Sequence, residues 1–154
     1  MAFYIGNLLQ SDEVKIGSPV FAKIHRAEIA SDVIEQIDAW FNAGISREDV
    51  HYFSIYEQDC AVGQILLHDI DNSEGSSLIG YHLFSPSLRG RGIGTKALQL
   101  LVRYVAEQTK LHHLVIITSQ DNLASQKLAQ KCGFQFTGAA REGVHLMVFE
   151  MVLF

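Results

Sequence analysis

The chain contains 154 residues, of which 48% are hydrophobic and 19% are charged. Because single domains most often contain about 100 to 150 residues, this length predicts one domain spanning residues 1–154, and the hydrophobic content excludes a disordered chain. The formal net charge of -5 disfavours a nucleic-acid binder or a protein of anionic membranes, because both need a basic face, and it favours an amine-bearing partner.

The cysteines and the apolar stretches indicate the environment of the protein. Cys60 and Cys132 are too few for a disulfide framework, and residues 1–10 do not resemble a secretion signal, so we expect a reducing, cytoplasmic location. The longest apolar stretch, residues 144–154, contains Glu150 and is much shorter than the roughly 20 residues of a membrane-spanning helix. We therefore expect no membrane partner.

The amino-terminal third predicts two strands and one helix. Residues 3–9 and 20–24 could each form a strand. Asp32 and Glu35 have the spacing of a capping box, and apolar residues then recur at helical intervals up to Gly44. This pattern predicts an amphipathic helix.

Strands and helices alternate in the rest of the chain. An antiparallel meander is predicted over residues 51–57, 61–70 and 78–84. After Pro86 the apolar residues fall on one helical face, at Ala97, Leu98, Leu101, Val102 and Val105. The apolar run at residues 114–117 predicts a strand covered on both faces. A second helix is predicted over residues 122–132, ending at Gly133, and two last strands over residues 134–138 and 144–154. The predicted fold class is α/β, and within it the mixed, α+β type.

A glycine-rich loop precedes the first of these two helices. It consists of Arg89, Gly90, Arg91, Gly92, Ile93, Gly94 and Thr95. Unpaired backbone N–H groups and the positive end of a helix dipole meet at such a corner, so the loop is a candidate phosphate site. A tight turn with solvated arginines is the alternative. The alternating glycines do not fit the Rossmann pattern, and the order Gly94-Thr95-Lys96 does not fit the P-loop.

The loop pattern Arg89-x-x-Gly92-x-Gly94 resembles the acetyl-CoA loop of the GNAT N-acetyltransferase superfamily, Arg/Gln-x-x-Gly-x-Gly/Ala. A second element of that family, Asn-x-x-Ala/Ser, matches Asn122 and Ser125, and a Gly-Phe pair follows at residues 133–134 as the family requires. For these two side chains helix capping is the alternative. The stretch at residues 79–83, followed by Pro86, is most similar to the branch that acetylates ribosomal-protein N-termini.

The resemblance implies a mixed, mostly antiparallel central sheet with helices on both faces, in which the strand ending near Phe84 and the strand from residue 114 splay apart. It implies acetyl-CoA as co-substrate and no metal. The pantetheine arm would pair with backbone groups of Leu83 and Phe84, the pyrophosphate would meet N–H groups of the loop, and Asn122 and Ser125 would also bind the cofactor. A primary amine would attack the thioester directly while a backbone N–H polarises its carbonyl.

The chain departs from the family pattern at both proton-handling positions. Leu78 occupies the place of a glutamate base, and Ala129 occupies the place of a tyrosine acid. His82 could replace the base, since its usual pKa near 6.5 suits proton transfer, or it could be a packed or solvent-facing histidine. Acidic residues that could act through water, attract a cationic acceptor or simply form a solvated turn are Asp69, Asp71 and Glu74.

Other candidate groups are interpreted as structural. Cys132 has the pattern of a small buried residue, and His112-His113 has no nearby Cys or carboxylate that would complete a metal site. The apolar final strand, ending at Phe154, could pair with a second subunit, because an exposed apolar edge is a liability in a monomer.

The predicted function is acetyl-CoA-dependent acetylation of a small-molecule or peptide amine. Two alternatives stay open. A catalytically weak CoA-binding module would fit the residues Leu78 and Ala129, and an acyltransferase acting on a drug amine such as an aminoglycoside would fit the loop equally well.

Overall fold

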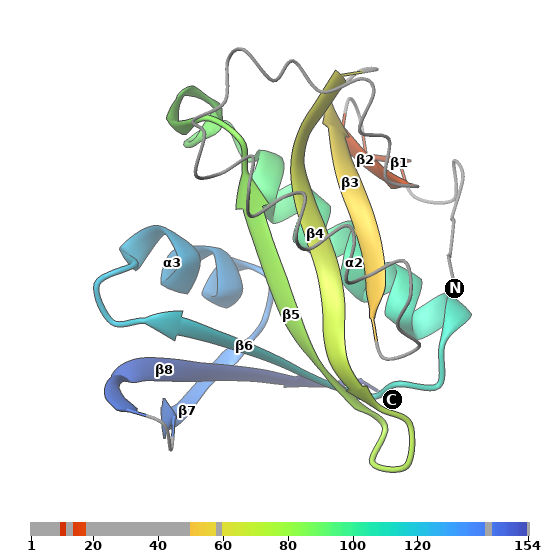
Figure 1. Cartoon of the computed structure of the whole chain (residues 1–154), viewed down its shortest axis with the longest axis vertical. Helices are drawn as coiled ribbons and strands as arrows, with labels where there is room; N and C mark the ends of the chain where they lie inside the picture. Colours follow the sequence, from red (N-terminus) through yellow and green to blue (C-terminus); the bar gives the residue numbers. More distant parts are fainter. Residues whose placement is uncertain (1–9, 12–13, 18–49, 58–59, 141–142, 154) are drawn as a thin grey trace.

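The computed structural model describes residues 10–11, 14–17, 50–57, 60–140 and 143–153. These residues form one eight-stranded sheet with the strand order β1-β2-β3-β4-β5-β6-β8-β7 (Figure 1). The strands are β1 (Gln10–Ser11), β2 (Val14–Gly17), β3 (His51–Glu57), β4 (Cys60–Asp71), β5 (Ser76–Leu83), β6 (His113–Ser119), β7 (Gln135–Ala140) and β8 (Gly143–Val152). All neighbouring strands are antiparallel except β5 and β6, which are parallel.

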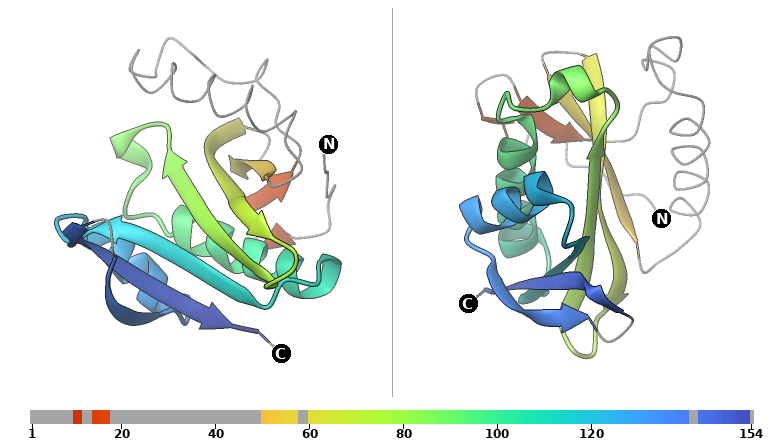
Figure 2. Two further views of the ribbon diagram at one scale, coloured as in Figure 1. Left: turned by 60° about the horizontal axis from the view of Figure 1, so that its bottom comes forward. Right: turned by 90° about the vertical axis from the view of Figure 1, so that its left-hand side faces the viewer.

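Two helices, α2 (Ile93–Gln108) and α3 (Leu123–Lys131), lie on the same face of this sheet (Figure 2). A short 3-10 helix, η3 (Pro86–Leu88), leads from β5 to the glycine-rich loop. In the described part of the chain, neither α-helix is long and apolar enough to cross a membrane.

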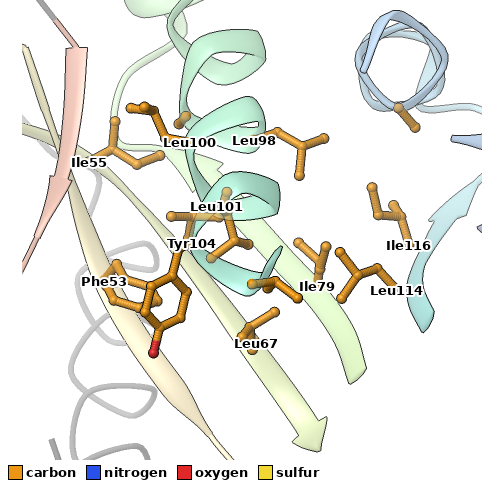
Figure 3. Close-up of a cluster of buried hydrophobic side chains, with 14 of the residues drawn as sticks. Phe53, Ile55, Leu67, Ile79, Leu98, Leu100, Leu101, Tyr104, Leu114 and Ile116 are labelled. Atoms are coloured by element: carbon orange, nitrogen blue, oxygen red, sulfur yellow. The ribbon is translucent and has the colours of Figure 1, made fainter. Parts of the chain in front are cut away.

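The main core lies between α2 and the sheet (Figure 3). Because the apolar residues of α2 recur every three or four positions, they form one buried stripe: Ile93, Ala97, Leu98, Leu101, Tyr104 and Val105. On the sheet side, alternate residues of β3 and β4 face this stripe, among them Phe53, Ile55, Ile65 and Leu67. Ser54, between Phe53 and Ile55, and Gln64, next to Ile65, therefore lie on the opposite face of the sheet. Both are buried.

The sheet opens between β5 and β6. The two strands pair only where residues 76–78 meet residues 113–115. Beyond this point β5 continues beside β4 as far as the pair Leu83 and Gly63, whereas all of β6 pairs with β8. Figure 1 shows the resulting divergence. On the side of β5 that faces β6, residues 79–83 have no described strand partner.

Most predicted elements are confirmed, including the antiparallel meander, the central unit β5-α2-β6-α3, the splay and the end of the second helix, where Gly133 has φ +93°. The strands predicted at residues 3–9 and 20–24 and the helix predicted between Asp32 and Gly44 lie outside the described residues. The strands β1 and β2 were not predicted, because two and four residues, with Lys15 among them, carry too little pattern.

Two expectations are wrong. The run at residues 114–117 is not covered on both faces, because the side chain of Ile117 is 39% exposed while Leu114 and Ile116 are buried. The carboxyl-terminal strand is not an edge, since β8 pairs with β6 on one side and with β7 on the other. This position removes the edge-pairing argument for a homodimer.

Candidate functional site

The glycine-rich loop forms an open corner at the start of α2. Gly90 and Gly92 have φ +77° and +79°, in the left-handed region that favours glycine. Gly92 is the N-cap of α2 and has no side chain. The first backbone N–H groups of the helix therefore receive no hydrogen bond from an N-cap side chain. A Cβ atom at either glycine would meet nothing within 4 Å. The corner can therefore bind an anion by its main chain.

A cleft of about 350 Å³ extends from this corner between β5 and α3. This volume lies in the range of small-molecule sites. Ten of the twelve predicted site residues line it: His82, Leu83, Arg89, Gly90, Gly92, Ile93, Gly94, Thr95, Asn122 and Ser125. The sequence did not identify eight further lining residues: Ile55, Ile65, Tyr81, Leu88, Ala124, Lys127, Leu128 and Lys131. Of the predicted set, Phe84 and Arg91 lie outside the lining.

Three cations line the cleft, and Arg91 has a different partner. Arg89 comes from the loop, and Lys127 and Lys131 come from successive turns of α3. The i, i+4 spacing of the two lysines is a sequence signal that could have identified them. Arg91 Nη2 instead donates to both carboxylate oxygens of Glu57, at 2.8 and 2.7 Å. The charge of Arg91 is therefore committed to the end of β3.

The backbone N–H groups of Leu83, the last residue of β5, and of Phe84, which follows it, face in opposite directions. Phe84 N donates to Val62 O at 2.9 Å, so the Phe84 amide faces β4 and not the gap. Because backbone N–H groups alternate in direction along a strand, the Leu83 amide faces the opening beside β6. The expectation that both residues offer backbone groups to a pantetheine arm is therefore wrong for the Phe84 N–H.

On the α3 side of the gap, two hydroxyl groups meet inside the cleft. Tyr81 Oη lies 2.6 Å from Ser125 Oγ, within hydrogen-bond distance. Asn122 is the N-cap of α3, and its Oδ1 accepts a hydrogen bond from Ser125 N at 3.1 Å. Asn122 thus caps the helix and lines the cleft at the same time. Burial raises the pKa of Tyr81, although its bond to Ser125 acts in the opposite direction.

On the other face of β5, His82 lies opposite Gln64 of β4. Burial lowers the pKa of His82 to about 4, so the expectation of an ordinary pKa near 6.5 is wrong. The imidazole is neutral at physiological pH. Gln64 is only 1% exposed, and in the described structure neither its side-chain nitrogen nor its side-chain oxygen has a hydrogen-bond partner.

The remaining sequence candidates take structural roles. Asp71 Oδ1 accepts hydrogen bonds from Ser73 and from the Glu74 backbone, which fixes the turn between β4 and β5 at the end remote from the loop. Asp69 contacts His68 at 2.7 Å in the same hairpin. Cys132 Sγ faces Thr95 O, and burial raises the pKa of its thiol to about 11. Ala129 is fully buried.

His113 Nε2 lies 2.7 Å from Glu150 Oε1 on the neighbouring strand β8. Among the described residues, however, no three His, Cys, Asp or Glu side chains are grouped as a metal site requires.

Comparison with known proteins agrees with this geometry. Residues 8–135 match the family model described as acetyltransferase (GNAT) domain, and the chain belongs to this family. The resemblance found in the loop and at Asn122 is therefore confirmed at the level of the family.

Two curated relatives illustrate the range of this family. The ribosomal-protein-serine acetyltransferase of Escherichia coli (strain K12) is 32% identical over 94 residues, which are 61% of this chain and 52% of that protein. The spermine/spermidine N(1)-acetyltransferase of Bacillus subtilis (strain 168) is 26% identical over 113 residues, 68% of this chain and 74% of that protein. The chain spans about half the length of the ribosomal-protein relative and of two others from Bacillus subtilis.

Solved structures share the fold. The ribosomal L7/L12 alpha-N-protein acetyltransferase RimL (crystal form 2, apo) has a TM-score of 0.77 at 20% identity, covering 93% of this chain and 95% of that chain. The microcin C7 self-immunity acetyltransferase MccE, in complex with acetyl-CoA and AMP, has a TM-score of 0.73 at 20% identity, covering 93% and 94%. At these identities the similarity establishes the fold.

Proposed function

We propose that the protein is a cytoplasmic, single-domain N-acetyltransferase that transfers an acetyl group from acetyl-CoA to a primary amine. The observation that carries this proposal is the shared cleft, which the phosphate-type corner at Gly92 and the strand edge at Leu83 both line. One ligand that is anionic at one end and rich in amide groups along its length suits both features.

Acetyl-CoA has this composition. Its pyrophosphate would meet the N–H groups of the loop, with Arg89 and the two lysines of α3 supplying positive charge at the rim. Its pantetheine amides would pair with the Leu83 backbone in the gap left by the splay. Positioning of the thioester and polarisation of its carbonyl by a fixed N–H group would provide most of the rate.

The acceptor amine would approach from the sheet face that carries His82. We assign to His82 the uptake of the proton that the amine loses. A base with a pKa of about 4 holds a proton only briefly and passes it to water, so an acceptor amine with a low pKa, part of which is already neutral, suits this site best. At neutral pH, deprotonation costs about 5 kcal/mol for a lysine-like amine and about 1 kcal/mol for an α-amine. This difference favours a peptide α-amine over a polyamine.

The test is a panel of amines incubated with acetyl-CoA while release of the CoA thiol is recorded. The panel contains a peptide with a free amino-terminal serine, the same peptide with a blocked amino terminus, spermine and an aminoglycoside. We expect turnover with the free peptide and none with the blocked one. Tight binding of acetyl-CoA without release of CoA for any amine would favour the rival function, a CoA-binding module.

A further inference from the structure

The cleft contains a contact between two hydroxyl groups that belongs neither to the glycine-rich loop nor to the sheet face of His82, where the amine is proposed to approach. Tyr81 Oη of β5 and Ser125 Oγ of α3 lie 2.6 Å apart, 44 residues apart in the sequence, and both residues line the cleft. A β5 tyrosine and an α3 serine therefore meet at the place where strand and helix enclose the ligand space.

The position of Tyr81 along β5 relates it to the bound thioester. Tyr81 and Leu83 are two residues apart, so their side chains lie on the same face and their backbone N–H groups face the same edge. The phosphate corner at Gly92 lies at the end of β5 beyond Leu83. A chain-like ligand anchored at Gly92 and paired with Leu83 thus continues toward Tyr81 with its thioester end.

A departing thiolate needs a proton or a hydrogen bond, and the cations that line the cleft, Arg89, Lys127 and Lys131, are assigned to the pyrophosphate. Among the lining residues, O–H groups belong to Tyr81, Thr95 and Ser125. Thr95 lies in the first turn of α2, beside the phosphate corner. Ala129 has no donor, and Cys132 Sγ is directed to Thr95 O. Tyr81 has the longest of these three side chains, and its hydroxyl lies within hydrogen-bond distance of Ser125 Oγ.

We infer that Tyr81 is the general acid of the proposed acetyl transfer, with Ser125 as the residue that positions and reprotonates it; this assignment rests on the proposed function. The amine nitrogen forms a bond to the carbonyl carbon, and the C–S bond then breaks with its electron pair on sulfur. The Tyr81 O–H proton moves to that sulfur to give the CoA thiol. The phenolate regains a proton from Ser125, which takes one from water, and the proton of the amine passes through His82 to water.

The protonation state of Tyr81 agrees with this role. Burial raises the pKa of its phenol, so the O–H group is intact at physiological pH. The titratable groups that line the cleft with it are His82, Arg89, Lys127 and Lys131, and Cys132, the C-cap of α3, also raises the pKa of Tyr81.

A purely structural contact between β5 and α3 is the rival explanation, and two matched variants separate it from catalysis. Tyr81→Phe and Ser125→Ala each remove the 2.6 Å contact between the two hydroxyl groups, and Ser125→Ala keeps only the 3.5 Å contact of Tyr81 Oη with Ser125 O, so a structural tie predicts similar effects of both. The inference predicts that Tyr81→Phe lowers kcat by about 100-fold, the usual contribution of a general acid, while Ser125→Ala lowers it by less than about tenfold. The Kd for acetyl-CoA, measured by calorimetry, stays within about threefold for Tyr81→Phe.

The pH profile gives a second readout that a structural role would not change. In the native protein kcat falls at alkaline pH as the phenol ionises; Tyr81→Phe loses this limb, and Cys132→Ala retains it. If the native protein releases CoA with an amine but Tyr81→Phe and Ser125→Ala have equal kcat, or if the alkaline limb survives in Tyr81→Phe, the assignment is wrong. If the native protein binds acetyl-CoA and releases no CoA with any amine of the panel, the proposed function fails and this assignment fails with it.

Discussion

Tyr81 and His82 are consecutive residues of β5, and their side chains lie on opposite faces of the sheet. Tyr81 packs on the core side and reaches Ser125 of α3, whereas His82 lies on the face of Gln64. The splay opens the side of β5 that faces β6 at these same two residues. In the proposed reaction this alternation would place a donor beside the leaving group and an imidazole beside the incoming amine.

The first prediction separates the two arginines of the loop. Arg89 lines the cleft, whereas Arg91 is paired with Glu57. Arg89→Ala should raise the Kd for acetyl-CoA about tenfold, the loss of one charge-assisted contact. Arg91→Ala removes the same charge from the same loop and should raise the Kd by less than about threefold, since exposed ion pairs contribute little. Calorimetric titration of both variants measures this, and a larger effect of Arg91→Ala would show that the Glu57 pair opens when the cofactor binds.

The second prediction concerns acid stability. The pKa of His82 is about 4 in the folded protein and about 6.5 when unfolded, so the unfolded chain binds more protons between these values. The stability from neutral His82 is fully present above pH 6.5 and is lost as the pH falls through 4, a change of about 3 kcal/mol. His82→Gln should lose this pH dependence of stability. The contributions of Asp71 and Glu150 to the pH dependence are the same in both proteins and cancel in the comparison.

Urea unfolding of both proteins at pH 7.5 and pH 4.5 measures the difference. The free energy of unfolding of the native protein should fall more steeply toward acid pH than that of His82→Gln. Parallel pH dependences would mean that His82 is solvated and that its role in the acetyl transfer has to be reconsidered.

A third prediction follows from the buried amide of Gln64. A buried polar atom without a partner costs about 1 to 3 kcal/mol, and leucine has a similar volume without the polar atoms. Gln64→Leu should therefore raise the free energy of unfolding by about 1 to 2 kcal/mol, visible as a higher Tm. Gln99→Leu is the matched control, because Gln99 is exposed on α2 and the change should be nearly neutral. A lower Tm for Gln64→Leu than for the control would show that the amide is satisfied in solution.

The sequence predicted the elements whose pattern is local. The helical period at Ala97, Leu98 and Leu101 and the glycine at residue 133 are sufficient for α2 and for the end of α3. Ile117 was misjudged, because an apolar run does not reveal that only one face of β6 is covered.

The loop side of the cleft was largely predictable, since near-consecutive residues of one loop line it. The contacts between distant residues were not. Tyr81 and Ser125 are separated by 44 residues, and Arg91 and Glu57 by 34. No spacing rule connects residues so far apart, because their meeting depends on the sheet order and on the placement of α3. The burial that lowers the pKa of His82 is likewise a property of the packed sheet and not of the strand sequence.

If the cleft beside Gly92 binds acetyl-CoA, this ligand must stabilise the folded protein, which thermal unfolding with and without ligand measures. A ligand at 100 times its Kd adds about 2.7 kcal/mol to the stability of the folded state, which raises Tm by about 5 to 10 °C in a domain of this size. We expect this increase with acetyl-CoA and with CoA and no change with NAD. An unchanged Tm with both CoA ligands, or an equal increase with NAD, would show that the cleft is not a specific CoA site.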